Sequence, residues 1–97
     1  MIQRTVLLKF AETTTQEQLL EVAKRFKALK DLVPGLDDVQ AGLNLAEKSK
    51  EFQVVLLVRF ENQAALDAYA VNADHQSVVT YIREVGRLDS IGVDIEV

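Results

Sequence analysis

Cysteine is absent from this sequence, and histidine occurs only once, at position 75. Without cysteine the chain has no disulfides, no thiol nucleophile and no thiolate metal ligand. A single histidine with no second ligand at a suitable spacing also argues against a metal centre. No glycine-rich phosphate loop or dinucleotide-binding fingerprint is present. We therefore expect neither a metal nor an organic cofactor.

Long apolar runs are also missing. No segment approaches the ~18 consecutive apolar residues that cross a bilayer, and the N-terminus has no apolar stretch of signal-peptide length. We therefore expect a cytoplasmic protein with no membrane partner. The 15 acidic residues outnumber the 11 basic ones, which gives a net charge of −4, and the basic residues do not cluster. This charge disfavours nucleic acid as a partner.

The remaining composition is that of an ordinary globular domain. Hydrophobic residues make up 48% of the 97 positions and charged residues 27%. This length predicts a single domain, residues 1–97, whose small core would gain substantially from a partner subunit.

Four segments alternate apolar and other residues, which is typical of strands. They are residues 2–10, about 36–45, 52–60 and 90–97. In the third segment the residues at both even and odd positions are mostly apolar, so both faces of that strand should be buried.

The first helix is predicted over residues 16–32, where apolar residues recur at three- and four-residue steps. Thr14 and Glu17 fit a capping box at its start. Pro34 and Gly35 end it, because proline cannot donate to the helical ladder and glycine accepts a left-handed turn.

Two shorter helices are predicted after the third strand. Asn62 can cap the first, which spans about residues 63–70, and Asp74 can cap the second, which runs to about residue 87. This places His75 in the first turn of the last helix, in line with its apolar side.

The order strand, helix, strand, strand, helix pair, strand predicts an α+β fold of the ferredoxin-like, split βαβ type. In that fold a four-stranded antiparallel sheet carries its helices on one face. Leu7, Val55 and Leu57 would make the other face apolar too. Since a monomer rarely exposes such a face, we predict a homodimer that packs sheet against sheet.

His75 and Tyr69 are the first candidate site residues, because the imidazole titrates near neutral pH and the tyrosine lies just across the helix break. The alternative is structural: a hydrogen-bonded core histidine and a packing aromatic. Residue types alone leave both interpretations open.

Arg4 and Asp94 are the other polar candidates. Arg4 falls on the apolar face of the first strand, where it either extends its head to the rim or pairs with a carboxylate in a pocket. Asp94 on the last strand is either exposed or lies inside the same cavity.

Several short motifs match a known family in their order and spacing. They are the opening Met-Ile-x-Arg-x-Val-Leu-Leu-Lys-Phe, Val33-Pro34-Gly35, Gly42-x-Asn44, Phe60-Glu61, Ala65-Leu66-Asp67-Ala68-Tyr69, His75-Gln76-x-Val78-Val79 and the closing Val93-Asp94-Ile95-Glu96-Val97. Over essentially its whole length the chain resembles the stress-responsive A/B barrel (Dabb) family.

That resemblance implies a ferredoxin-like subunit in a dimeric α+β barrel. The family includes a polyketide cyclase in which a Tyr and a His six residues apart carry an aldol condensation, and those positions fall on Tyr69 and His75. His75 would then be a general base, and Tyr69 would orient or polarise the substrate. The resemblance also implies a substrate pocket between helices and sheet, lined by Val6, Leu8, Phe26, Leu56, Val58 and Val71.

The chain departs from the family at two histidine positions. Family members commonly carry His-Pro-x-His before the last helix and a histidine in the first strand. Here the corresponding residues are Asn72-Ala73-Asp74-His75 and Arg4. If Arg4 faces the cavity, it would favour an anionic or carbonyl-bearing ligand.

Three functions follow as hypotheses. The first is a homodimer that binds a small, apolar, carbonyl-containing molecule, and the second is a cofactor-independent cyclase or isomerase that uses His75 as base. The third is a non-enzymatic stress-response dimerisation module. A cavity of about 300 Å³ or more on which His75 and Tyr69 converge would favour the first two.

Overall fold

The computed structural model describes residues 1–97 and contains the predicted elements in the predicted order. The strands are β1 (Ile2–Phe10), β2 (Leu36–Leu43), β3 (Val54–Phe60) and β4 (Arg87–Glu96). The helices are α1 (Gln16–Ala28), α2 (Gln63–Ala70) and α3 (Ala73–Glu84), with short 3₁₀ turns η1 (Leu29–Asp31) and η2 (Glu47–Ser49). No helix is long and apolar enough to cross a bilayer.

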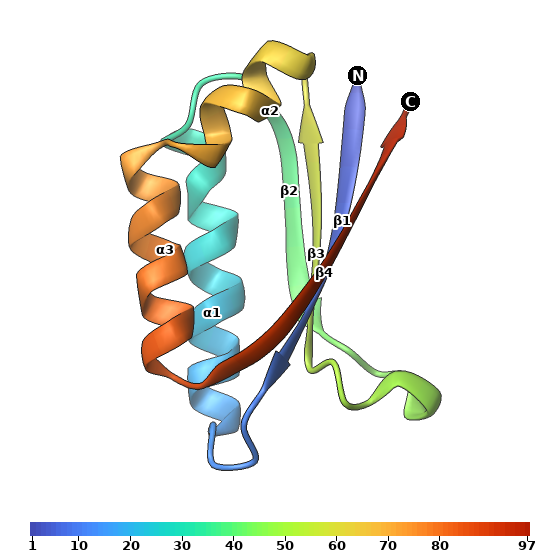
Figure 1. Ribbon diagram of the computed structural model, residues 1–97, viewed down its shortest axis with the longest axis vertical. Coiled ribbons are helices and arrows are strands. Elements are labelled where there is room, and N and C mark those ends of the chain that lie inside the picture. Colours follow the sequence, from blue (N-terminus) through green and yellow to red (C-terminus); the bar gives the residue numbers. More distant parts are fainter.

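The four strands form one antiparallel sheet in the order β2-β3-β1-β4, which confirms the ferredoxin-like α+β fold. Helices α1 and α3 lie side by side over one face of this sheet (Figure 1). Strand β4 begins at the end of α3 and then diverges from the helices toward its C-terminal end (Figure 1). The two chain ends meet there, where the Met1 ammonium donates to the Val97 carbonyl.

The core lies between the helices and the inner face of the sheet. Strand β3 contributes four buried side chains at alternate positions: Val54, Leu56, Val58 and Phe60. Helix α1 covers them with Val22 and Phe26, which confirms the predicted apolar stripe. Full burial of each such side chain contributes roughly 1.5–3 kcal/mol, so this layer dominates the stability of the subunit.

The face of the sheet away from the helices is also apolar. Its centre is formed by Leu7, Val55 and Leu57, as predicted. The pairing of β1 with β4 adds three β4 side chains to the same face, because Leu7 is opposite Ile91, Thr5 opposite Val93 and Gln3 opposite Ile95. These three are 44%, 58% and 59% exposed. We call the six residues Leu7, Val55, Leu57, Ile91, Val93 and Ile95 the outer sheet patch.

Asn62 caps α2 as predicted, with its side-chain oxygen accepting from the Ala65 amide, whereas the other two predicted helix caps are displaced from their expected residues. The capping box of α1 is Thr15 with Gln18, and not Thr14 with Glu17. Thr14 instead donates its hydroxyl to the Val85 carbonyl, which ties the start of α1 to the end of α3. A Thr-x-x-Glu/Gln pattern begins at each threonine, so only this tertiary contact distinguishes them.

Helix α3 is capped by Asn72, and not by Asp74. The Asn72 side-chain oxygen accepts from the backbone amides of Asp74 and His75 at 2.8 and 3.2 Å. Asp74 lies inside the first turn, where its negative charge interacts favourably with the helix dipole.

Strand boundaries also differ from the predicted ones. Strand β2 ends at Leu43, and Leu45 is 93% exposed in the following loop. Asn44 ends the strand because its side-chain amide donates to the Ser49 and Phe52 carbonyls across that loop. Helix α3 stops at Glu84, and Gly86, with a φ of 114°, makes the turn. Arg87 is therefore the first residue of β4 and not the last of a helix.

The position of the α1 cap is open to a direct test. Thr15→Ala removes the acceptor for the Gln18 amide and should lower the free energy of unfolding by about 1 kcal/mol in urea denaturation. Thr13→Ala, an exposed neighbour without a capping bond, should change it by less than about 0.5 kcal/mol. Equal losses in the two variants would contradict the assignment.

Candidate functional site

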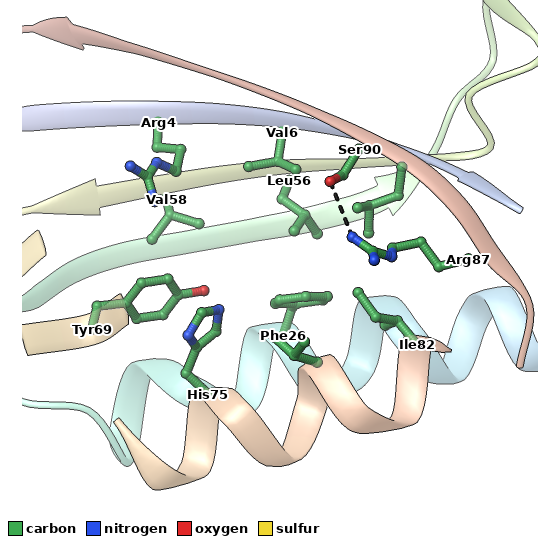
Figure 2. Close-up of a pocket in the computed structure, with 12 residues that line it drawn as sticks. Arg4, Val6, Phe26, Leu56, Val58, Tyr69, His75, Ile82, Arg87 and Ser90 are labelled. Carbon is green, nitrogen blue, oxygen red and sulfur yellow. Dashed lines mark hydrogen bonds between the residues drawn. The ribbon is translucent and has the colours of Figure 1, made fainter. Parts of the chain in front are cut away.

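One pocket opens between the inner face of the sheet and helices α1 and α3 (Figure 2). Its cavity volume is about 140 Å³, and it is partly open to solvent. This is smaller than the volume of about 300 Å³ that would by itself favour ligand binding or catalysis over a dimerisation module, so the pocket admits only a small molecule or one end of a larger one. Its lining combines apolar residues with a few polar ones: Arg4, Val6, Leu8, Phe26, Leu56, Val58, Tyr69, His75, Val79, Ile82, Arg87 and Ser90.

Most of the residues predicted for the site line this pocket. They are Arg4, Val6, Leu8, Phe26, Leu56, Val58, Tyr69 and His75. Val71 was predicted wrongly: it is 80% exposed, because it ends α2 at the turn into α3. Asp94 lies beside the pocket rather than in its wall, bonded to Arg4.

Sequence reasoning missed four lining residues. Val79 and Ile82 follow His75 by four and seven positions on α3, so the helical spacing could have identified them. Arg87 was missed because the helix was expected to extend to residue 87, whereas Ser90 lies in the predicted strand on the same side as Asp94 and could have been identified from that alternation. The place of Arg87 in the pocket depends on where β4 begins.

His75 and Tyr69 are stacked on each other. Their ring centroids are 3.8 Å apart with an interplanar angle of 25°. Tyr69 in turn meets the edge of Phe60, in the core, at 5.1 Å and 66°. The Asn72 cap fixes the first turn of α3 and so holds His75 against Tyr69. The pair is therefore rigidly placed at one end of the pocket (Figure 2).

The environment of His75 favours the neutral imidazole. Burial lowers the pKa of His75, and the positive charge of Arg4 acts in the same direction. The backbone carbonyls of Tyr69 and Ala70 partly oppose this shift in pKa. Nδ1 is buried without a hydrogen-bond partner, whereas Nε2 is not enclosed in this way. At neutral pH His75 is therefore an uncharged group that can accept a proton.

Whereas His75 can accept a proton, Tyr69 keeps its own and can donate a hydrogen bond. Burial raises the pKa of Tyr69 to about 12, with Arg4 opposing the shift, so its hydroxyl keeps its proton at neutral pH. The hydroxyl is directed toward the middle of the pocket (Figure 2). Because the two rings stack face to face, the hydroxyl and the imidazole do not hydrogen-bond to each other. Tyr69 is thus available as a donor to a ligand.

Arg4 and Asp94 form an ion pair at the edge of the pocket. The Arg4 Nε and Nη2 atoms donate to the two Asp94 carboxylate oxygens at 2.8 and 3.0 Å. The β1–β4 register places the two residues directly opposite each other. The hydrogen bond from Arg4 lowers the pKa of Asp94, so the carboxylate stays ionised and compensates the guanidinium charge. Both side chains are partly exposed, so the pair lies at the rim of the pocket.

No group of three or more His, Asp or Glu side chains converges as a metal site would require. Besides Arg4, Arg87 and Ser90, the pocket offers apolar walls, a protonated phenol and a neutral imidazole. This set suits a small uncharged or singly charged organic molecule with a hydrogen-bond acceptor.

Residues 2–97 match the model of the stress responsive A/B barrel domain, Dabb. The chain is 26% identical to olivetolic acid cyclase of Cannabis sativa over 76 residues, which cover 76% of this chain and 75% of the cyclase. A dimeric ferredoxin-like protein of unknown function from Jannaschia sp. CCS1 is 28% identical, with a TM-score of 0.80 over 99% of this chain and 98% of that one. A dimeric protein of the same fold, also of unknown function, from Bacteroides fragilis is 23% identical, with a TM-score of 0.81 over 99% and 95%.

The lowered pKa of His75 predicts how stability depends on pH. Unfolded histidine binds its proton with a pKa near 6.5, whereas the folded chain binds it less readily. The unfolded state therefore takes up more protons, and stability should fall as the pH drops below about 6.5 toward the folded pKa. His75→Phe retains the stacked ring but removes this titration. Urea denaturation between pH 7.5 and 5.5, at one protein concentration, should show a steeper loss for the natural chain. Parallel curves for the two proteins would contradict the prediction.

Proposed function

The chain belongs to the stress-responsive A/B barrel (Dabb) domain family, and from that membership and the pocket we propose that it is a homodimer that binds a small, largely apolar, carbonyl-containing molecule. The observation that carries this proposal is the stacked Tyr69–His75 pair at the end of an otherwise apolar pocket.

A carbonyl group suits the free donor in this pocket. The Tyr69 hydroxyl is protonated at neutral pH and is not among the buried side-chain atoms that lack a partner, so it remains open to the pocket. A ligand oxygen in the pocket could take the place of water as the acceptor for this hydroxyl. A carbonyl oxygen accepts such a bond without bringing its own donor into the apolar part of the pocket. The rest of the ligand should be apolar, because Leu8, Leu56 and Val58 form the wall.

The size of the pocket limits the ligand. A volume of about 140 Å³ accommodates a single ring or a short chain, and the open side allows a longer molecule to extend into solvent. The protein therefore recognises the carbonyl-bearing end of its ligand.

The outer sheet patch supports the homodimer. Its six apolar side chains lie on the face of the sheet that no helix of this chain covers. A contiguous apolar surface of this kind is characteristic of an interaction site. Two-fold symmetry would bring the same patch of a second copy against it, so that the two sheets close into a barrel. The similar proteins from Jannaschia and Bacteroides fragilis, which are described as dimeric, support the same arrangement.

The dimer is tested by size-exclusion chromatography with light scattering at micromolar concentration. The natural chain should have twice the mass of one subunit. Leu57→Asp should elute as a monomer, because it places a charge at the centre of the outer sheet patch. Leu45→Asp makes the same change at an exposed loop residue outside the patch, and should remain dimeric. A monomeric natural chain, or a dimeric Leu57→Asp, would refute the proposed interface.

A cofactor-independent cyclase or isomerase is the second candidate, and the similarity to olivetolic acid cyclase favours it. In this proposal the neutral His75 removes a proton from the carbon next to the carbonyl, and the electron pair of that C–H bond forms the enolate. The Tyr69 hydroxyl donates to the enolate oxygen and stabilises its negative charge. Both residues lie in the same pocket in the protonation states that these roles require.

One NMR experiment tests binding and proton abstraction together. Acetophenone should shift amide signals near Tyr69 and His75, and should bind about fivefold or more tightly than α-methylstyrene, which has the same shape without the oxygen. Tyr69→Phe should remove this preference. If His75 is a base, the methyl protons of acetophenone should exchange in D₂O faster with the natural chain than with His75→Phe. If neither compound shifts these signals, the dimerisation module replaces the binding proposal. If acetophenone binds without faster exchange, only the catalytic proposal fails.

A further inference from the structure

Arg87 is the second arginine of the pocket, and it lies at the opposite end from Tyr69 and His75 (Figure 2). Its Nη1 donates to the Ser90 hydroxyl at 3.2 Å, the only hydrogen bond that its side chain makes. Its Nε is buried and has no hydrogen-bond partner. No carboxylate forms an ion pair with Arg87, whereas Arg4 is paired with Asp94.

The charges around the pocket do not cancel. Arg4 and Asp94 neutralise each other at the rim, and His75 is uncharged at neutral pH. The carboxylate nearest to Arg87 along the chain, Asp89, accepts from the Ser90 amide and lies on the other face of the sheet, opposite Lys9. The pocket is therefore left with one uncompensated positive charge, that of Arg87.

From this arrangement we infer that Arg87 and Ser90 form an anion site for the carboxylate of the ligand. The inference rests on the proposed function and narrows the ligand class to monocarboxylic acids with a short apolar body. A guanidinium carries five N–H donors in a fork that matches the two oxygens of a carboxylate. Ser90 occupies only one donor, and with no other partner the guanidinium can turn to present two more. The Ser90 hydroxyl can donate its own proton to the same carboxylate.

The same geometry orients the ligand. With the carboxylate at Arg87, the apolar body of the ligand lies along Phe26 and Ile82, and its far end reaches the Tyr69–His75 pair (Figure 2). One negative charge neutralises the pocket, whereas a dianion would carry an unpaired charge into an apolar site. A keto acid with its two polar groups at opposite ends would satisfy Arg87 and Tyr69 together.

The test compares two probes of the same shape, phenylacetate and phenylacetamide, by isothermal titration calorimetry at low salt and pH 7.5. The natural chain should bind phenylacetate on the order of tenfold more tightly, because only the carboxylate makes charge-assisted hydrogen bonds with Arg87. This comparison needs no substitution, so it holds even if a variant of Arg87 folds poorly. Equal affinities for the two probes would overturn the inference.

Substitutions then test whether Arg87 is the residue whose charge binds the carboxylate. Arg87→Met should reduce the preference for phenylacetate to within about twofold while phenylacetamide still binds, and Arg87→Lys should retain part of it. Arg83→Met removes the same charge from an exposed position on α3 and should leave the preference unchanged. A preference that survives Arg87→Met would also overturn the inference. If neither probe binds while acetophenone does, only the inferred anion site is refuted. If none of the three compounds binds, both the anion site and the proposed function are refuted.

Discussion

The antiparallel pairing of β4 with β1 is the constraint on which the rest of this structure depends. It places Asp94 opposite Arg4 and Ile91 opposite Leu7. Alternate side chains of β4 therefore point to opposite faces of the sheet. The polar side, with Ser90 and Asp94, borders the pocket, whereas the apolar side completes the outer sheet patch. A shift of one residue would exchange the two sides and remove both the rim ion pair and the proposed dimer surface.

The pocket lies between the inner face of the sheet and helices α1 and α3, and the first residues of β4, next to α3, line one part of it. At one end Tyr69 is anchored against Phe60 and holds His75 by stacking. At the other end Gly86 turns the chain so that Arg87 enters the pocket from the start of β4. The two arginines differ in their surroundings: Arg4 is compensated by Asp94, and Arg87 has only the Ser90 hydroxyl. This asymmetry gives the pocket a neutral end that suits a carbonyl and a positive end that suits a carboxylate.

Much of the fold could be predicted from alternation and helical spacing. The order of elements, the apolar character of both faces of β3 and the stripe of α1 follow directly from which positions are apolar. The site was predicted less well. His75 and Tyr69 stood out because of their chemistry, but Val71 was misplaced, since an apolar residue at a helix end can face either way. Arg87 was missed because the helix was extended past Gly86, although a glycine just beyond the last helical turn is a common helix stop.

The sequence by itself determined the ferredoxin-like fold class, the apolar character of both sheet faces and the candidate pair Tyr69 and His75. These are properties of residue type and period, which are set locally along the chain. Tertiary structure alone decided which threonine caps α1, which residue Arg4 pairs with, and that Arg87 faces a pocket without a compensating acid. Each of these depends on contacts between residues far apart in the chain, such as Thr14 with Val85 and Arg4 with Asp94. Local pattern does not identify such partners, because residues far apart in the chain meet only when the strands pair and the helices pack on the sheet.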